Sequence, residues 1–399
     1  MATRHSLTLV AGLLAFVLGA APVGAQEEAE PEPEPEWAGS FGVADSETRF
    51  KLAGFAEFDF IYDSDEIATR CQFVTSTIAT DRGDSAGSSE GRTSYCVNAT
   101  RLTLESRTPT KLGRLTTFVS IDLFGDPNKP SLRMRQAYGE LEGVLLGGDL
   151  LAGQAWSTFT DRAAWPDMLD FEGPSSSISS RRPQLRWSKQ VSGSIETRLA
   201  AEAPSGRIDG ADATSRWPDF VARTRFTHAH GYVQGAGILR DVRATFEDNP
   251  ATGALGWGLA ASGSVVFPAL IGTGDAILFE VSYGEGTGGY YDDAPPNAVY
   301  DPDSGQLEPL PVLGYYVAYE HTWTDTLSSG LLYSWIGVDN LDAQPADALH
   351  EGAYLSANLI WRPDTPLKFG VEFLRGGTRD KDGAKGSDNR VQASAQFSF

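Results

Sequence analysis

The chain has 399 residues, too many for one ordinary soluble core but within the range of a large β-barrel. Its formal net charge of −21 argues against a nucleic-acid partner. After the N-terminal region no apolar run is long enough to cross a membrane as a helix, whereas 43 glycines and 11% aromatic residues suit short strands and tight turns.

Residues 1–25 have the pattern of a secretory signal peptide. Arg4 supplies the positive start, Leu7 to Leu18 form the apolar core, and Val23 to Ala25 form a small-residue cleavage site. A membrane anchor is the alternative, but the apolar core is short and no stop-transfer charges follow it. We therefore expect export, and the absence of a cysteine near the cleavage site argues against a lipoprotein.

An acidic segment rich in Glu and Pro is expected to follow as a periplasmic linker, over residues 26–48. It begins with the alternating run QEEAEPEPEPE. This composition favours an extended, self-repelling spacer without a core of its own. A tether, an interaction arm and a disordered leader all fit it. The remaining residues, 49–399, are expected to form one domain.

A period of two begins at Phe50 and recurs to the end of the chain. In the first segment Phe58 and Phe60 share one face, and Glu57 and Asp59 share the other, as in a half-buried strand. No helical period appears in the mature chain. About sixteen such segments are predicted, each near the length that a tilted strand needs to cross a bilayer: 50–62, 99–107, 114–124, 131–142, 145–155, 182–190, 194–203, 218–227, 231–241, 254–266, 275–284, 312–323, 328–338, 351–361, 367–376 and 390–399.

Long and short connections alternate between these segments, which is typical of an outer-membrane barrel. Two of them strain the pattern, because 125–130 is short for a loop and 267–274 is long for a turn. The long ones are 63–98, 156–181, 204–217, 242–253, 285–311, 339–350 and 377–389, and the short ones include 108–113, 191–193, 228–230, 324–327 and 362–366. The predicted fold is therefore all-β, a transmembrane antiparallel β-barrel of about sixteen strands.

A water-soluble β-sandwich also alternates, but it buries its apolar face against a second sheet. The last segment places Val391, Ala393, Ala395, Phe397 and Phe399 on one face, and a terminal Phe on such a strand resembles the recognition signal of outer-membrane barrels. Closure would leave no strand edge in lipid. With the signal peptide and the even strand count, this favours the outer membrane of a Gram-negative bacterium, with a periplasmic N-terminus.

The connection 156–181 is polar and turn-rich, yet it carries large apolar side chains such as Trp156, Phe159, Trp165 and Phe171. Such side chains gain by packing on a surface. We expect this loop to fold into the barrel and to narrow the channel.

Arginines gather on the predicted inward faces and on this loop, where they would attract anions to a narrow channel. Pairing with Glu105, Glu140, Glu196 and Glu202 is the alternative role, and both roles can hold. The loop adds Asp161, Asp167, Asp170 and Glu172, which would set a transverse field across the lumen. The arginines are Arg101, Arg107, Arg133, Arg135, Arg162, Arg181, Arg182, Arg186, Arg198, Arg223, Arg225 and Arg240.

The chain has two cysteines, Cys71 and Cys96, and both fall in the first predicted loop. An exported chain meets an oxidising compartment, so a loop disulfide is expected. Two free buried thiols are the alternative, which the polar surroundings disfavour.

Three stretches, AGFAEFDFIYD at 53–63, LRMRQAYGEL at 132–141 and much of 145–187, resemble the DcaP-type porin family. The later strands match only as generic barrel strands. The resemblance implies a sixteen-stranded homotrimeric channel for small solutes, preferably anions such as dicarboxylates, with the loop after the fifth strand as its constriction. It makes Arg133, Arg135, Arg182 and Arg186 the best pore-lining candidates. The short Glu-Pro run departs from the longer helical segment of family members, which puts any assembly role of that segment in doubt.

An outer-membrane hydrolase and a plugged structural or adhesive barrel are the competing functions. The mature chain offers His228, His230, His321 and His350, which suit turns and membrane interfaces, and it has neither G-x-S-x-G nor H-E-x-x-H. No catalytic residue, metal or cofactor is expected. The lipid bilayer, further copies of the chain and small anionic solutes are the expected partners.

Overall fold

The computed structural model describes residues 37–81, 90–245, 252–269 and 271–399. The expected signal peptide at 1–25 and the Glu-Pro run at 26–36 lie outside the described residues. Of the segment expected as linker, β1 (Phe41–Gly42) pairs with Phe50 and Arg49.

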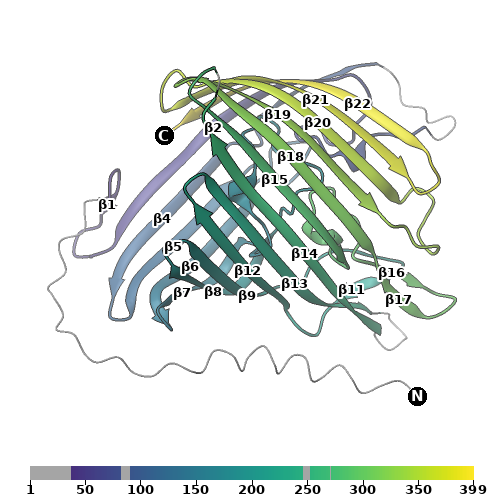
Figure 1. Cartoon of the computed structure of the whole chain (residues 1–399), viewed down its shortest axis with the longest axis horizontal. Helices are drawn as coiled ribbons and strands as arrows, with labels where there is room; N and C mark the ends of the chain where they lie inside the picture. The colour runs from purple at the N-terminus through teal and green to yellow at the C-terminus, as the bar shows by residue number, and fades with distance from the viewer. Residues whose placement is uncertain (1–36, 82–89, 246–251, 270) are drawn as a thin grey trace. The chain divides into compact units, whose positions relative to one another are not determined.

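Sixteen antiparallel strands form a closed barrel (Figure 1), which confirms the predicted fold class. Each strand pairs with the next, and the barrel closes where Phe55 to Asp63 of the first strand pair with Ser398 to Arg390 of the last. The strands are β2 (Arg49–Asp63), β4 (Arg101–Thr110), β5 (Gly113–Asp122), β6 (Arg133–Leu145), β7 (Gly148–Trp156), β8 (Arg181–Ser192), β9 (Ile195–Glu202), β12 (Asp219–His228), β13 (Gly231–Thr245), β14 (Thr252–Phe267), β15 (Gly274–Glu285), β18 (Pro311–Thr324), β19 (Leu327–Val338), β20 (Leu349–Trp361), β21 (Leu367–Asp380) and β22 (Lys385–Ser398).

The period of two becomes an alternation between an apolar outer face and a filled interior. In β18, Tyr315 and Val317 are exposed on the outside, whereas Tyr316 and Ala318 are buried inside. Aromatic side chains ring both ends of the outer face, as in the girdles of membrane barrels. Trp323, Trp361, Phe369 and Phe397 lie near the short turns, and Trp257, Tyr283, Tyr315 and Trp335 lie near the long loops.

The prediction of a long loop at 377–389 is wrong. β21 continues to Asp380 and β22 begins at Lys385, so only four residues connect them. The turn closes because the N–H of Gly383 donates a hydrogen bond to the carbonyl of Asp380 at 2.9 Å, and Gly383 adopts a φ of 90° that favours glycine. The polar composition of this segment indicates a loop, but its residues alternate in a hairpin that extends beyond the membrane belt.

The helices in the described residues are single 3-10 turns: η1 (Thr75–Thr77), η3 (Arg162–Ala164) and η4 (Gly288–Tyr290). None of the helices in this part of the chain is long and apolar enough to cross a membrane.

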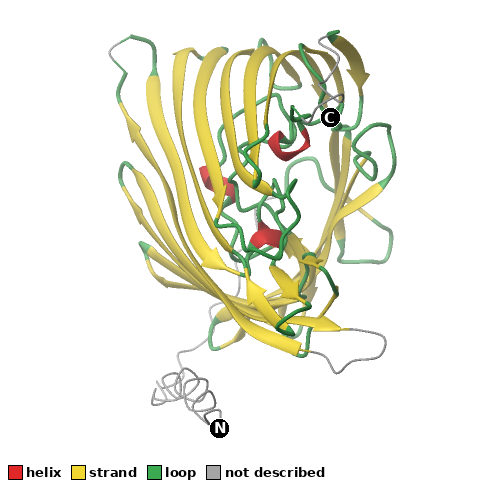
Figure 2. Ribbon diagram, turned by 90° about the vertical axis from the view of Figure 1, so that its right-hand side faces the viewer, coloured by secondary structure: helices red, strands yellow, loops and turns green. Residues whose placement is uncertain are grey.

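Described parts of three long loops fold into the barrel (Figure 2). The loops are L1 (64–100, containing β3, Arg92–Cys96), L3 (157–180) and L6 (286–310, containing β16, Ala298–Asp301, and β17, Gln306–Pro309), and the β16–β17 hairpin of L6 projects past the strand ends (Figure 1). Ile178 of L3 and Tyr290 of L6 are fully buried and pack with inward side chains such as Val312 and Ile336. Phe73 of L1 packs on Tyr354 of β20 with ring centroids 5.7 Å apart. The prediction that 156–181 folds inward is confirmed, whereas the inward course of L1 was not expected.

Candidate functional site

Four glutamates of the barrel wall accept hydrogen bonds from the backbone of L3. A loop inside a barrel must satisfy its N–H groups, and bonds to a carboxylate are among the stronger ones. The four lie on β9, β15, β18 and β21, so L3 is fixed along much of the wall. Glu202 accepts from Thr158 at 2.6 Å, Glu280 from Ile178 at 2.8 Å, Glu320 from Asp167 at 2.6 Å, and Glu372 from Leu169 and Asp170 at 2.8 Å each.

These four glutamate anchors were not predicted, although the sequence contains a pattern that indicates them. No Lys or Arg occurs from residue 244 to residue 361. The inward carboxylates of Glu280 and Glu320 therefore have no basic neighbour on their own or adjacent strands, and a buried carboxylate needs a donor. Backbone N–H groups of an inserted loop supply it.

The loop aspartate Asp161 is an anchor with three wall partners. It accepts bonds from Arg225 of β12 at 2.6 Å, Tyr232 of β13 at 3.0 Å and Ser262 of β14 at 2.7 Å. It also caps η3 by accepting from the N–H of Ala163 at 3.2 Å. Only 1% of Asp161 is exposed, so its carboxylate fixes the start of L3 and does not face the lumen.

Asp167 and Asp170 fix the middle of the loop. Asp167 pairs with Arg362 and, at 2.9 Å, with Lys368. Burial alone would raise the pKa of Asp167, but these two cations outweigh it and hold the pKa below its ordinary value. Asp170 accepts from the N–H of Phe73 in L1 at 3.0 Å and from the hydroxyl of Tyr354 at 3.1 Å. All three loop aspartates predicted from the sequence are thus occupied by anchoring contacts.

Most of the predicted lumen arginines are paired with carboxylates. Arg133 and Arg135 of β6 share Asp122 of β5, which is 1% exposed, at 2.8 and 2.5 Å. Nearer the short turns, the pairs are Arg107 with Glu105 at 2.9 Å, Arg186 with Glu140 at 3.5 Å, Arg198 with Glu196 at 2.7 Å and Arg223 with Glu196 at 2.5 Å. In this part of the wall the arginines therefore form ion pairs with neighbouring glutamates, which is the alternative role considered for them.

Two arginines hold L6 rather than face the open lumen. Arg182 donates to the carbonyl of Gly289 at 2.5 Å and lies 4.9 Å from the ring centroid of Tyr290. Arg240 pairs with Asp219 at 3.0 Å and donates to Asn297 of L6 at 2.9 Å. Both are less than a tenth exposed.

Three arginines, Arg101, Arg162 and Arg181, form no ion pair with any residue that the structure describes. Arg162 is exposed on L3 and lies 3.7 Å from the ring centroid of Trp165 and 5.0 Å from that of Trp156. Arg181 of β8 lies 4.9 Å from the ring centroid of Trp156, and Arg101 of β4 lies 5.2 Å from that of Phe55. Aromatic faces stabilise these cations without neutralising them.

Acidic side chains gather where L3, L6 and L1 meet. Asp293 of L6 accepts bonds from the hydroxyl of Thr75 and from the N–H of Ser76 in L1 at 3.4 Å. Burial raises the pKa of Asp293 to about 6. Burial and neighbouring carboxylates also raise the pKa of Glu172 and of Asp292. These three carboxyl groups are therefore protonated more readily than free ones.

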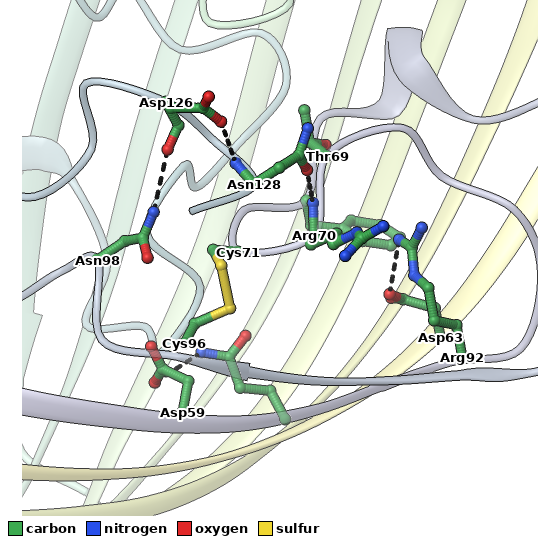
Figure 3. The surroundings of a disulfide bond; sticks show 12 residues. Asp59, Asp63, Thr69, Arg70, Cys71, Arg92, Cys96, Asn98, Asp126 and Asn128 are labelled. Carbon is green, nitrogen blue, oxygen red and sulfur yellow. Dashed lines mark hydrogen bonds and ion pairs between the residues drawn. A yellow bond between two sulfur atoms is a disulfide. The ribbon is translucent and has the colours of Figure 1, made fainter. Parts of the chain in front are cut away.

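The predicted disulfide between Cys71 and Cys96 is present (Figure 3). Close to it, L1 is tied to the connection after β5, because Asn98 donates to the carbonyl of Asp126 at 3.0 Å and the N–H of Arg70 donates to Asn128 at 2.9 Å. The disulfide thus fixes the part of L1 that enters the barrel.

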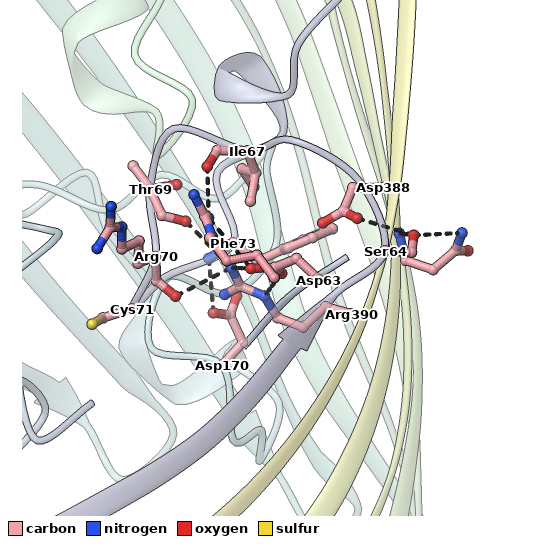
Figure 4. A network of polar contacts seen from close by, with 12 residues as sticks. Asp63, Ser64, Ile67, Thr69, Arg70, Cys71, Phe73, Asp170, Asp388 and Arg390 are labelled. Atoms are coloured by element: carbon pink, nitrogen blue, oxygen red, sulfur yellow. Dashed lines mark hydrogen bonds and ion pairs between the residues drawn. The ribbon is translucent and has the colours of Figure 1, made fainter. Parts of the chain in front are cut away.

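A fully buried ion pair lies at the barrel seam (Figure 4), where Arg390 of β22 bonds Asp63 of β2 at 2.6 Å. Arg390 also donates to the carbonyls of Thr69 and Arg70 at 3.3 Å, and it lies 5.0 Å from the ring of Phe73. One guanidinium thereby joins the first strand, the last strand and L1.

His228, His230 and His321 lie away from the lumen. His321 pairs with Asp275 at 2.6 Å on the outer face of the barrel, against Trp323. His228 and His230 are exposed at a short turn. No group of metal-ligating residues is arranged to hold an ion within the described part of the chain.

A family model described as DcaP outer membrane protein matches residues 40–399. The solved outer membrane channel DcaP of Acinetobacter baumannii superposes with a TM-score of 0.77 at 22% identity, covering 90% of this chain and 99% of that one. An anion-selective porin from Comamonas acidovorans gives 0.59 at 9% identity over 88% and 100% of the chains, and the trimer form of OmpT of Vibrio cholerae gives 0.56 at 11% over 89% and 100%. At these identities the likeness to solved structures shows the fold. No curated protein matches the sequence.

Proposed function

The chain belongs to the DcaP outer membrane protein family and is an outer-membrane porin, and from this premise we propose that it is a passive channel favouring small anions such as dicarboxylates. We further propose that it acts as a homotrimer, that residues 1–25 direct its export and that residues 26–48 form a periplasmic linker ahead of the barrel domain. The long loops would then face the outside of the cell. No covalent step or cofactor is part of this function.

The unpaired guanidinium groups of Arg101, Arg162 and Arg181 are the observation that carries the proposed anion preference. The wall carboxylates that hold L3 lie on β9, β15, β18 and β21, and we place the passage on the other side of the loop, along the arginine-rich strands β4 to β8. A solute moving there loses part of its hydration. Fixed guanidinium N–H groups replace that hydration for an anion and repel a cation.

The paired arginines contribute less to this preference. Arg186, Arg198 and Arg223 stand beside carboxylates, so their net field in the channel is small. Arg133 and Arg135 together keep one positive charge, because the two share a single carboxylate. The proposed positive field beside L3 therefore comes mainly from Arg101, Arg162 and Arg181. The unpaired carboxyl groups of Glu172 and Asp292 oppose it less, because burial raises their pKa and favours the neutral form.

The test is the reversal potential of single channels in a planar bilayer under a salt gradient. We expect anion preference in the wild type, and its reduction when Arg101, Arg162 and Arg181 are changed together to Gln. At about 8 Å in water two unit charges interact by ~0.5 kcal/mol, so loss of the three charges should lower the anion permeability roughly tenfold and raise the cation permeability by a similar factor.

A matched control removes three arginines from the rim and the loops, Arg207, Arg243 and Arg375, and should leave the ratio of anion to cation permeability unchanged. Cation preference in the wild type would keep the porin and reject the anion selectivity. Silence from well-folded protein would instead support a plugged structural barrel. Chemical crosslinking of the native membrane checks the trimer, because only dimers and trimers of this chain should accumulate.

A further inference from the structure

A stacked pair of phenylalanines joins L3 to the arginine-rich wall. Phe124 follows β5 and Phe171 lies in L3, and their ring centroids are 3.7 Å apart with an interplanar angle of 25°. Phe124 is 4% exposed and packs in one cluster with Ile61 and the Cys71–Cys96 disulfide. Phe124 is therefore held in place by packing against the disulfide, and Phe171 of L3 stacks on it.

The two rings support the guanidinium groups of the nearest arginines. The Cζ atom of Arg133 lies 5.6 Å from the centroids of both rings, and that of Arg135 lies 5.4 Å from the centroid of Phe171. Asp122 bonds both arginines and also accepts from the N–H of Phe124 at 3.1 Å. Each guanidinium is thus held by a carboxylate at its edge and by an aromatic ring at its face.

These two arginines act on the unpaired cations beside them. The charge of Arg135 acts on Arg101, Arg162 and Arg181, and that of Arg133 acts on Arg181. Asp122 holds one edge of each guanidinium, but an arginine side chain has several rotatable bonds, so without the ring of Phe171 each guanidinium could pivot about that carboxylate. The distance between this positive charge and a solute in the passage would then vary, and the average attraction of an anion would be weaker.

We infer that Phe171 is a positioning residue for ion selection: stacked on Phe124, it fixes Arg133 and Arg135 so that their charge adds to that of the unpaired arginines. This rests on the proposed anion preference and adds a specific role for the loop. L3 narrows the channel and also supplies the surface that orders its cations.

The experiment compares reversal potential and single-channel conductance of the wild type, Phe171→Leu and Phe171→Tyr. Leu retains apolar volume but loses the ring face, so the ratio of anion to cation permeability should fall roughly two- to fivefold, the range for a cation–π contact. Tyr keeps the ring and should restore the wild-type ratio.

Phe159→Leu is the matched control. Phe159 also lies in L3, and its ring packs edge-on against that of Tyr290 with centroids 5.9 Å apart. Its cluster contains neither Arg133 nor Arg135. It should leave the ratio unchanged. An unchanged ratio in Phe171→Leu, or a Tyr variant that behaves like Leu, would overturn the inference.

The proposed anion preference and the proposed role of Phe171 can be rejected independently. A wild type without anion preference overturns the proposed function, whereas an anion-selective wild type with an unaffected Phe171→Leu overturns only the role of the ring. Folding is checked by heat-modifiable mobility in SDS gels. If Leu prevents folding, Phe171→Met replaces it under the same criteria.

Discussion

Replacing Asp161 with Ala should loosen the start of L3 and destabilise the barrel. This carboxylate is 1% exposed and bonds Arg225, Tyr232 and Ser262 on three successive strands. A hydrogen bond to a charged group contributes ~1.5–3 kcal/mol. The three bonds share one carboxylate, and Arg225 keeps its bond to Gln234 at 2.9 Å. The loss should therefore resemble that of one partner of a buried ion pair, about 3–5 kcal/mol.

The assay is urea unfolding in lipid vesicles, followed by tryptophan fluorescence, together with single-channel recording. We expect the free energy of unfolding to fall by the amount above. The open-channel current should become noisier, because Glu320 and Glu372 still hold the middle of the loop while its start moves. Asp325→Ala, at an exposed short turn, is the control and should match the wild type.

A double-mutant cycle identifies the partner. If Asp161 acts mainly through Arg225, then Asp161→Ala combined with Arg225→Gln should cost less than the sum of the two single changes. Stability and current noise equal to those of the wild type in Asp161→Ala would refute the anchoring role, and would return this carboxylate to the list of groups that face the solute.

Two further predictions concern the loops. Because burial raises the pKa of Glu172 above its ordinary value of 4.5, its contribution to stability is full below that value and is lost as the pH rises through the raised pKa. The thermal midpoint should therefore fall from mildly acidic to mildly alkaline pH, and should fall less in Glu172→Gln; equal slopes would contradict this. Replacing Cys71 and Cys96 with Ser opens a link between residues 25 positions apart and should cost about 3.5 kcal/mol in urea unfolding, with reduced wild type matching the variant and oxidised wild type differing from it.

The barrel itself could be predicted from the sequence, because alternation is a local property of each strand. Tyr315 and Tyr316 are adjacent and chemically identical, yet the period of two places the first outside and the second inside. The hairpin at 381–384 was not predictable in this way, since its polar residues resemble a loop until the register with the opposing strand is known.

The candidate site could be predicted only in outline. Arginines on inward faces and an inserted loop follow from pattern and composition, but their partners depend on which strands meet across the lumen. Asp161 and Arg225 are far apart in sequence and join only because L3 crosses to β12. Arg133 and Arg162 have the same side chain, and only the position of Asp122 makes the first paired and the second free.

The distribution of charge along the chain shows how an acidic protein could have the basic passage that we propose. The wall from residue 244 to residue 361 has no Lys or Arg, so its glutamates hold the N–H groups of L3. The aspartates of L3 are in turn bound by Arg225, Arg362 and Lys368. Beside L3, the guanidinium groups of β4, of β8 and of the loop itself form no ion pair with a described residue. Glu172 and Asp292 are unpaired there as well, but burial raises the pKa of each, so both are protonated more readily than a free carboxyl group. The net charge of −21 therefore does not set the field in the lumen. The pairing of buried groups sets it, and a change in one anchoring partner should alter ion selection more than a change of equal charge on the outer loops.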